Sequence, residues 1–115
     1  MKVINRTKGN VLADNATIAT SFMSRIKGLL GKAGLSKGEG LIISDCGSIH
    51  TFFMNFPIDV IFLNYQHTVV KVKKAVIPFR LVDCPFTGSI TIELPAGVID
   101  TSRTEVGDYI ELQIA

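Results

Sequence analysis

The sequence predicts a mainly β protein: a single-domain β-sandwich or barrel, jelly-roll-like, with one short α-helix near residues 20–31. Two observations favour this fold class. Many short apolar or alternating segments are separated by turn residues, as is typical of sandwiches and barrels. The length of 115 residues suits one domain, and a content of 47% hydrophobic residues suffices for a core without metal or disulfide bonds. We therefore expect one domain that spans residues 1–115.

The predicted strands follow one another along the whole chain and cover residues 2–5, 10–14, 16–19, 41–45, 59–63, 68–76, 89–94 and 109–114. The first three are expected to form a small meander because Asp14-Asn15 is a natural turn pair. The run at 59–63 is almost continuously apolar, so both its faces should be covered. The run at 89–94 alternates and should be half-buried. Residues 78–88 should form a long loop over one end of the sheet.

One segment has helical rather than strand spacing. Its apolar side chains would share one face of a helix and are Phe22, Ile26, Leu29 and Leu30. Thr20 or Ser21 can cap the first turn, and Gly31 or Gly34 can end the helix. The apolar face of this helix is expected to pack on a sheet.

Charge and hydropathy limit the partners. The net charge of +2 is small, and the densest basic run, Lys71 to Lys74, alternates with valine. Such a run is typical of a strand with a solvated outer face, so no nucleic-acid partner is expected. No apolar run reaches the length of a membrane span, and the first residues lack the features of a signal peptide. We expect a cytoplasmic protein.

Four landmarks occur in a fixed order: Gly28–Gly31 with Glu39–Ile42, Cys46–Leu63, Ile92–Gly97 and Val106–Asp108. Together they resemble the family called domain of unknown function 192, over most of the chain. The resemblance implies a compact β-sandwich of jelly-roll kind with a small helix. It brings no established activity, cofactor or catalytic residue. Asn55 stands where the family pattern has a basic residue, and if that residue serves an anionic ligand, this chain should bind the ligand less well.

Asp59 is the first candidate site residue, because it lies at the start of the most apolar strand. An ionised carboxylate there needs partners or a raised pKa. A structural interpretation gives it backbone N–H donors near the turn at Pro57, or an ion pair with Arg80. A functional interpretation makes it a general base or a ligand contact. We favour the structural interpretation, since structural ion pairs perturb carboxylates as readily as active sites do.

Cys46, His50 and Met54 form a second candidate group. His50 and Met54 would share one face of an extended segment, and with Cys46 they offer soft ligands that suit Cu(I). Cys46 and His50 could instead act as nucleophile and base, with Asp59 or Asn55 as the third member. Packed core is the simpler interpretation of such side chains. Both cysteines, Cys46 and Cys84, are expected to be free thiols in a reducing compartment.

Arg80, at the entry to the expected loop at 78–88, can hold a carboxylate or a phosphate with two hydrogen bonds, but an internal ion pair is the interpretation that we favour. Three hypotheses remain open. The preferred one is a binding or accessory module without catalysis, with a small ligand or a protein segment near His50, Asp59 and Arg80. The second is a small hydrolase or transferase that uses Asp59, His50 or Cys46. The third is a metal-handling protein with Cys46, His50 and Met54 as ligands. No cofactor is expected.

Overall fold

A computed structural model describes residues 1–19, 35–44, 48–50, 56–78, 80–85 and 87–114. Ten strands and one helix lie in this part of the chain. The strands are β1 (Lys2–Asn5), β2 (Asn10–Ala13), β3 (Asn15–Ala19), β4 (Glu39–Ser44), β5 (Ser48–His50), β6 (Ile58–Leu63), β7 (Val69–Val76), β8 (Leu81–Asp83), β9 (Ile90–Pro95) and β10 (Ile110–Gln113). The helix is α2 (Val98–Ser102). The protein is therefore mainly β, as the sequence predicts.

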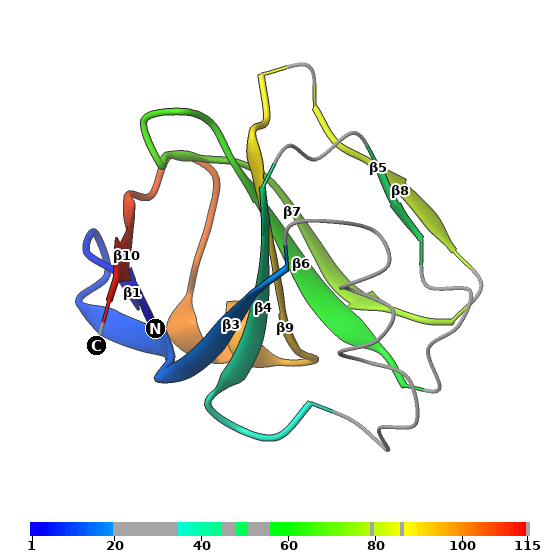
Figure 1. The fold of residues 1–115 in the computed structure, drawn as a ribbon, viewed down its shortest axis with the longest axis horizontal. Helices are drawn as coiled ribbons and strands as arrows, with labels where there is room; N and C mark the ends of the chain where they lie inside the picture. The colour runs from blue at the N-terminus through cyan, green and yellow to red at the C-terminus, as the bar shows by residue number, and fades with distance from the viewer. Residues whose placement is uncertain (20–34, 45–47, 51–55, 79, 86, 115) are drawn as a thin grey trace.

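The strands form three sheets. A five-stranded sheet has the order β3-β4-β9-β6-β7, a three-stranded sheet has the order β10-β1-β2, and β5 pairs with β8. In Figure 1 the three-stranded sheet lies on the left, the five-stranded sheet in the middle and the β5–β8 pair on the right. The five-stranded sheet is thus the central layer, and β7 forms one of its edges.

The central sheet has an apolar core on each face. The first core joins it to the three-stranded sheet and to α2, through residues such as Val3, Ile61, Ile92, Ile99 and Ile110. The second core lies on the opposite face and reaches β8, through Leu41, Ile43, Val60, Phe62, Val76 and Val82. Strand β6 contributes to both cores, and all six of its residues are buried. This confirms the prediction that the apolar run at 59–63 is covered on both faces.

Strand β9 differs from its prediction. It lies between β4 and β6, so its polar side chains face the second core instead of solvent. Thr91 pairs with Ile43 and Phe62, and Glu93 pairs with Leu41 and Val60. Both polar residues are 0% exposed. The prediction that this strand is half-buried is therefore wrong. On the face that carries Thr91 and Glu93, the neighbouring strands β4 and β6 present apolar residues.

Three further expectations are corrected or left untested. The first three strands do not form a meander: β1 and β2 pair antiparallel, but β3 leaves them and pairs parallel with β4. The expected loop at 78–88 contains strand β8. The helix expected near residues 20–31 lies outside the described residues. Within the described part of the chain, no helix is long and apolar enough to cross a membrane.

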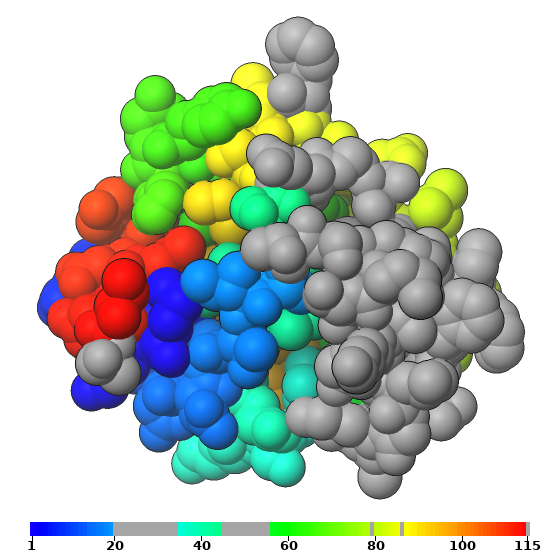
Figure 2. Space-filling model, in the orientation of Figure 1, coloured from blue at the N-terminus to red at the C-terminus, as the bar shows by residue number. Residues whose placement is uncertain are grey.

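The first and last strands close the three-stranded sheet. Lys2 of β1 is in register with Gln113 of β10, and Asn5 with Ile110. Figure 2 shows the two chain ends side by side on one flank of the molecule, as blue and red atoms. Residues more than 100 positions apart in the sequence therefore share one sheet.

The hydroxyl of Thr91 leads to the first prediction. Its Oγ1 is buried and has no hydrogen-bond partner among the described residues. Because an unsatisfied buried hydroxyl destabilises the folded state, we expect Thr91→Val to leave the free energy of unfolding unchanged or to raise it by about 1 kcal/mol. Urea unfolding followed by far-UV circular dichroism measures the change.

The matched control is Thr104→Val. Thr104 is also buried, but its Oγ1 accepts a hydrogen bond from Asn5 Nδ2 at 3.0 Å and is bonded to Ser102 Oγ at 2.7 Å. Loss of this hydroxyl should lower the free energy of unfolding by about 1–3 kcal/mol, since its buried partners each lose a hydrogen bond. Equal destabilisation by both substitutions would contradict the description of Thr91.

Candidate functional site

Asp59 on β6 serves as a backbone anchor. It is 1% exposed. Its Oδ1 accepts the N–H of Ala75 at 2.8 Å, and its Oδ2 accepts those of Gly97 at 3.1 Å and Ile99 at 2.8 Å. Backbone N–H groups are the kind of partner that the structural interpretation expects, but they belong to β7 and to the start of α2 instead of the turn at Pro57. One carboxylate thus ties together three segments of the chain.

The bond to Ala75 holds an unusual backbone conformation. Ala75 has a φ of 49° although it is not a glycine, and such residues are uncommon in the left-handed region. The register between β6 and β7 also shifts between Ile58 and Val60. Asp59 therefore fixes a bulge near the end of β7, and this bulge shapes the surface beside it.

A cavity of about 250 Å³ opens beside that bulge. We call it the β7–β8 groove. The end of β7, the turn after it and β8 provide its lining, namely Lys73, Lys74, Ala75, Val76, Ile77, Arg80, Leu81 and Val82. Three of these side chains are cationic, and none is acidic. The groove is suited to an anion.

The same groove has an apolar wall. Ile77 is 49% exposed and Leu81 is 62% exposed, whereas Val76 and Val82 are buried in the second core. Exposed aliphatic side chains beside cations can contact a ligand that is apolar in one part and charged in another. The arrangement is amphipathic, with a basic rim and an apolar wall.

The lysines of β7 have different surroundings. Lys71 donates to the backbone oxygen of Asp83 at 2.9 Å, and its Nζ lies 5.7 Å from the ring centre of Phe62. Lys74 forms an ion pair with Asp100 of α2. Lys73 forms no ion pair with a described residue, and it stands in register with Val60. Lys73 is therefore the lysine of the groove whose charge is available to a ligand.

His50 lies close to the groove through its backbone. In the β5–β8 pair it is in register with Leu81, which lines the groove. Arg80 also lines the groove, whereas Asp59 is buried beside it and accepts the N–H of Ala75, a lining residue. The side chain of His50 lies outside what the structure describes.

The metal and nucleophile hypotheses depend mostly on residues outside the described part. Cys46 and Met54 belong to the segments 45–47 and 51–55, so neither hypothesis is tested. Among the described residues, no three or more His, Cys, Asp or Glu side chains form a group that could hold a metal ion. Cys84 is disulfide-bonded, so the expectation of a free thiol at this position is wrong.

Glu93 is a residue that the sequence reasoning did not single out. It is 0% exposed on the central strand of the protein. Its only signal in the sequence was its place in the landmark Ile92–Gly97. Alternation alone suggested an outward-facing carboxylate, and only the pairing of β9 with β4 and β6 shows that it faces the second core.

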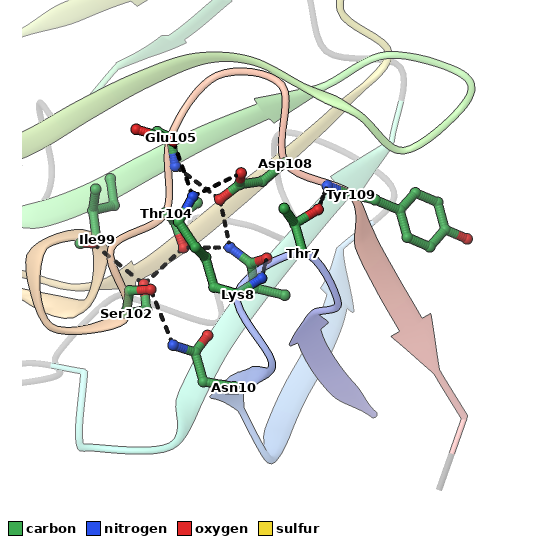
Figure 3. A network of polar contacts seen from close by, with 10 residues as sticks. Thr7, Lys8, Asn10, Ile99, Ser102, Thr104, Glu105, Asp108 and Tyr109 are labelled. Carbon is green, nitrogen blue, oxygen red and sulfur yellow. Dashed lines mark hydrogen bonds and ion pairs between the residues drawn. The ribbon is translucent and has the colours of Figure 1, made fainter.

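A second buried polar cluster lies where the β1–β2 turn meets the segment after α2 (Figure 3). Asp108 accepts hydrogen bonds from Asn5 Nδ2 at 2.9 Å, from Lys8 Nζ at 3.0 Å and from the N–H of Glu105 at 3.1 Å. Lys8 Nζ also donates to Glu105 Oε1 at 3.0 Å. Three of these four contacts join residues about 100 positions apart, which indicates a structural role.

The charged groups in this cluster shift one another's pKa values. Burial raises the pKa of Asp108, but the hydrogen bonds from Asn5, Lys8 and the Glu105 N–H, with the charge of Lys8, outweigh burial and hold the pKa below its usual range. The hydrogen bonds to Glu105 and Asp108 raise the pKa of Lys8. Both side chains are therefore charged at neutral pH.

The fold and the groove define a small layered β-protein with an amphipathic groove that has a basic rim. The chain belongs to the family called domain of unknown function 192, described as "Uncharacterized ACR", whose model matches residues 3–112. This confirms the resemblance carried by the four landmarks. The family is uncharacterised, so membership does not assign an activity to the chain.

Curated relatives include archaeal proteins that are named only as UPF0127 proteins. One from Thermococcus sibiricus is 36% identical over 116 residues, which cover 97% of this chain and 75% of the relative. One from Pyrococcus abyssi is 32% identical over 115 residues, which cover 95% of each chain. One from Pyrococcus furiosus is 30% identical and is covered to 96%.

Two solved structures share the fold. A protein of unknown function from Novosphingobium aromaticivorans matches with a TM-score of 0.83 at 20% identity, over 97% of this chain and 84% of that chain. A protein from Sinorhizobium meliloti matches with a TM-score of 0.80 at 18% identity, over 96% and 89%. At these identities the likeness shows the fold alone.

Proposed function

We propose that the protein is a binding module that holds a small organic anion in the β7–β8 groove and performs no chemistry of its own. The observation that carries this proposal is the combination of a basic rim and an apolar wall in one cavity. The charged group of the ligand lies against Lys73 and Arg80. Its apolar part lies against Ile77 and Leu81.

The position of Asp59 supports binding over catalysis. Both of its oxygens accept backbone N–H groups, so its carboxylate is committed to holding the bulge at Ala75. A general base needs an oxygen that can reach the proton it removes. Asp59 is therefore a positioning residue of the groove in this proposal.

The proposal predicts that hexanoate binds in the groove and that hexylamine, with the same alkyl chain and a positive charge, does not. Titrations of the ¹⁵N-labelled protein, followed by ¹H–¹⁵N NMR, would show hexanoate shifts centred on residues 73–77 and 80–82. Because Lys73 and the ligand are opposite charges near the surface, Lys73→Gln should weaken binding about three- to ten-fold. Added salt should weaken binding to the wild-type protein.

Lys2→Gln is the matched control. Lys2 is an exposed lysine on β1, in the three-stranded sheet, so its removal changes the net charge equally without touching the groove. Hexanoate affinity should then stay within about two-fold of wild type, since exposed charges at long range are screened. Equal binding of hexylamine, or shifts that avoid the groove, would exclude the proposed function.

A further inference from the structure

Lys74 lies in the groove and also forms an ion pair with a residue outside it. It lines the β7–β8 groove, yet its Nζ lies 2.6 Å from Oδ1 of Asp100 in α2. Asp100 is not part of the groove lining. A cation of the groove is thus held by a carboxylate of the protein itself.

The buried side chain of Asp59 holds the two backbone segments that carry this ion pair. Asp59 Oδ1 accepts the N–H of Ala75, the residue after Lys74, and Asp59 Oδ2 accepts the N–H of Ile99, the residue before Asp100. A single buried carboxylate therefore sets the spacing between the two backbone segments that carry the pair. The contact between Lys74 and Asp100 therefore follows from the positions of their two backbone segments.

The ion pair is nevertheless easy to break. The side chain of Lys74 is 55% exposed and that of Asp100 is 68% exposed. Exposed ion pairs contribute little to stability, because water competes with them and salt screens them. A ligand with a second negative charge can therefore offer Lys74 a partner at least as good as Asp100.

We propose that Asp100 sets the charge selectivity of the groove by competing with the ligand for Lys74. A monoanion binds at Lys73 and Arg80 and leaves the Lys74–Asp100 pair in place. A dianion, such as a phosphate monoester, draws Lys74 away from Asp100 and gains a third cation. This inference rests on the proposed function, and it names the dianion as the ligand class that Asp100 controls.

The test compares hexanoate with hexyl phosphate at pH 8, where a phosphate monoester carries close to two negative charges. Asp100→Asn should bind hexyl phosphate about three- to ten-fold more tightly than wild type, because the competing charge is gone. Its affinity for hexanoate should change less than two-fold. In the double variant Asp100→Asn/Lys74→Gln the gain for hexyl phosphate should disappear.

A second readout does not depend on affinity. Asp100 raises the pKa of Lys74, mainly through its hydrogen bond and then through its charge, and the charge of Asp59 adds to this. An NMR titration of the Lys74 side chain should therefore show a lower pKa in Asp100→Asn. The same resonance should move when hexyl phosphate is added to the wild-type protein, and should stay in place with hexanoate.

The outcomes separate the two proposals. If neither probe binds wild-type protein in the groove, the proposed function is wrong and this inference falls with it. If hexanoate binds and responds to Lys73→Gln, but Asp100→Asn strengthens both probes equally or neither of them, only the role of Asp100 is wrong. A gain restricted to hexyl phosphate and abolished in the double variant supports it.

Discussion

Replacing Asp59 by alanine is expected to lower the free energy of unfolding by about 3–9 kcal/mol, because three backbone N–H groups lose their acceptor and each such loss costs about 1–3 kcal/mol. Since small domains are stable by only about 5–15 kcal/mol, much of the variant should be unfolded or close to unfolding. Urea or thermal unfolding followed by far-UV circular dichroism measures the loss. Asp59→Asn should cost less, since it keeps one acceptor oxygen.

Asp100→Asn provides the comparison for Asp59. It removes a carboxylate from the same region, but one that is 68% exposed and whose only ion-pair partner among the described residues is an exposed lysine. Its effect on stability should stay within about 1 kcal/mol. If Asp59→Ala were as mild as Asp100→Asn, the anchoring role of Asp59 would be contradicted.

Asp108 should produce the second large effect. Asp108→Ala removes a carboxylate that is 3% exposed. The N–H of Glu105 loses its acceptor, and Asn5 Nδ2 and Lys8 Nζ each lose one of two acceptors. Breaking a buried, paired charge in this way typically costs about 3–5 kcal/mol. Chemical unfolding at neutral pH measures the loss, and exposed Asp83→Asn should change stability by less than about 0.5 kcal/mol.

The same residue should make stability depend on acid. The pKa of Asp108 is lower in the folded protein than its ordinary value of 3.8. As the pH falls, this carboxylate is therefore protonated in the unfolded chain before it is protonated in the folded protein. The stability that it contributes is therefore fully present above the unfolded value and is lost as the pH falls through the lower, folded value. Urea midpoints between pH 6 and pH 2 should fall less steeply in Asp108→Asn than in wild type. Parallel curves would contradict this assignment.

The positions of the strands were predicted more reliably from the sequence than the burial of their side chains. Residues 59–63 were recognised as doubly covered because every side chain in the run apart from Asp59 is apolar, and this signal is local. The burial of Thr91 and Glu93 could not be recognised in the same way. Whether an alternating strand faces solvent depends on which strands flank it, and β4 and β6 are brought beside β9 from about 50 and 30 positions earlier in the sequence.

The candidate site shows the same division. Asp59 was recognised as needing partners because an ionised carboxylate in an apolar run is costly, but its donors lie 16, 38 and 40 residues away. Arg80 was recognised as a possible anion contact. Lys73 was interpreted only as part of a solvated strand face, because its place beside Arg80 depends on how β7 and β8 approach each other. Side-chain chemistry was readable from the sequence, whereas the cavity required the fold.

The pairing of β1 with β10 has a consequence for synthesis of the chain. Val3 and Ile4 are translated more than 100 residues before Leu112 and Glu111, which stand opposite them. Until β10 has been translated, β1 has no native partner on that edge, although β2 can already pair with its other edge. Pairings between such distant segments also slow folding, because a long loop must close before the contact forms. The three-stranded sheet should therefore be a late structure in the biogenesis of this protein.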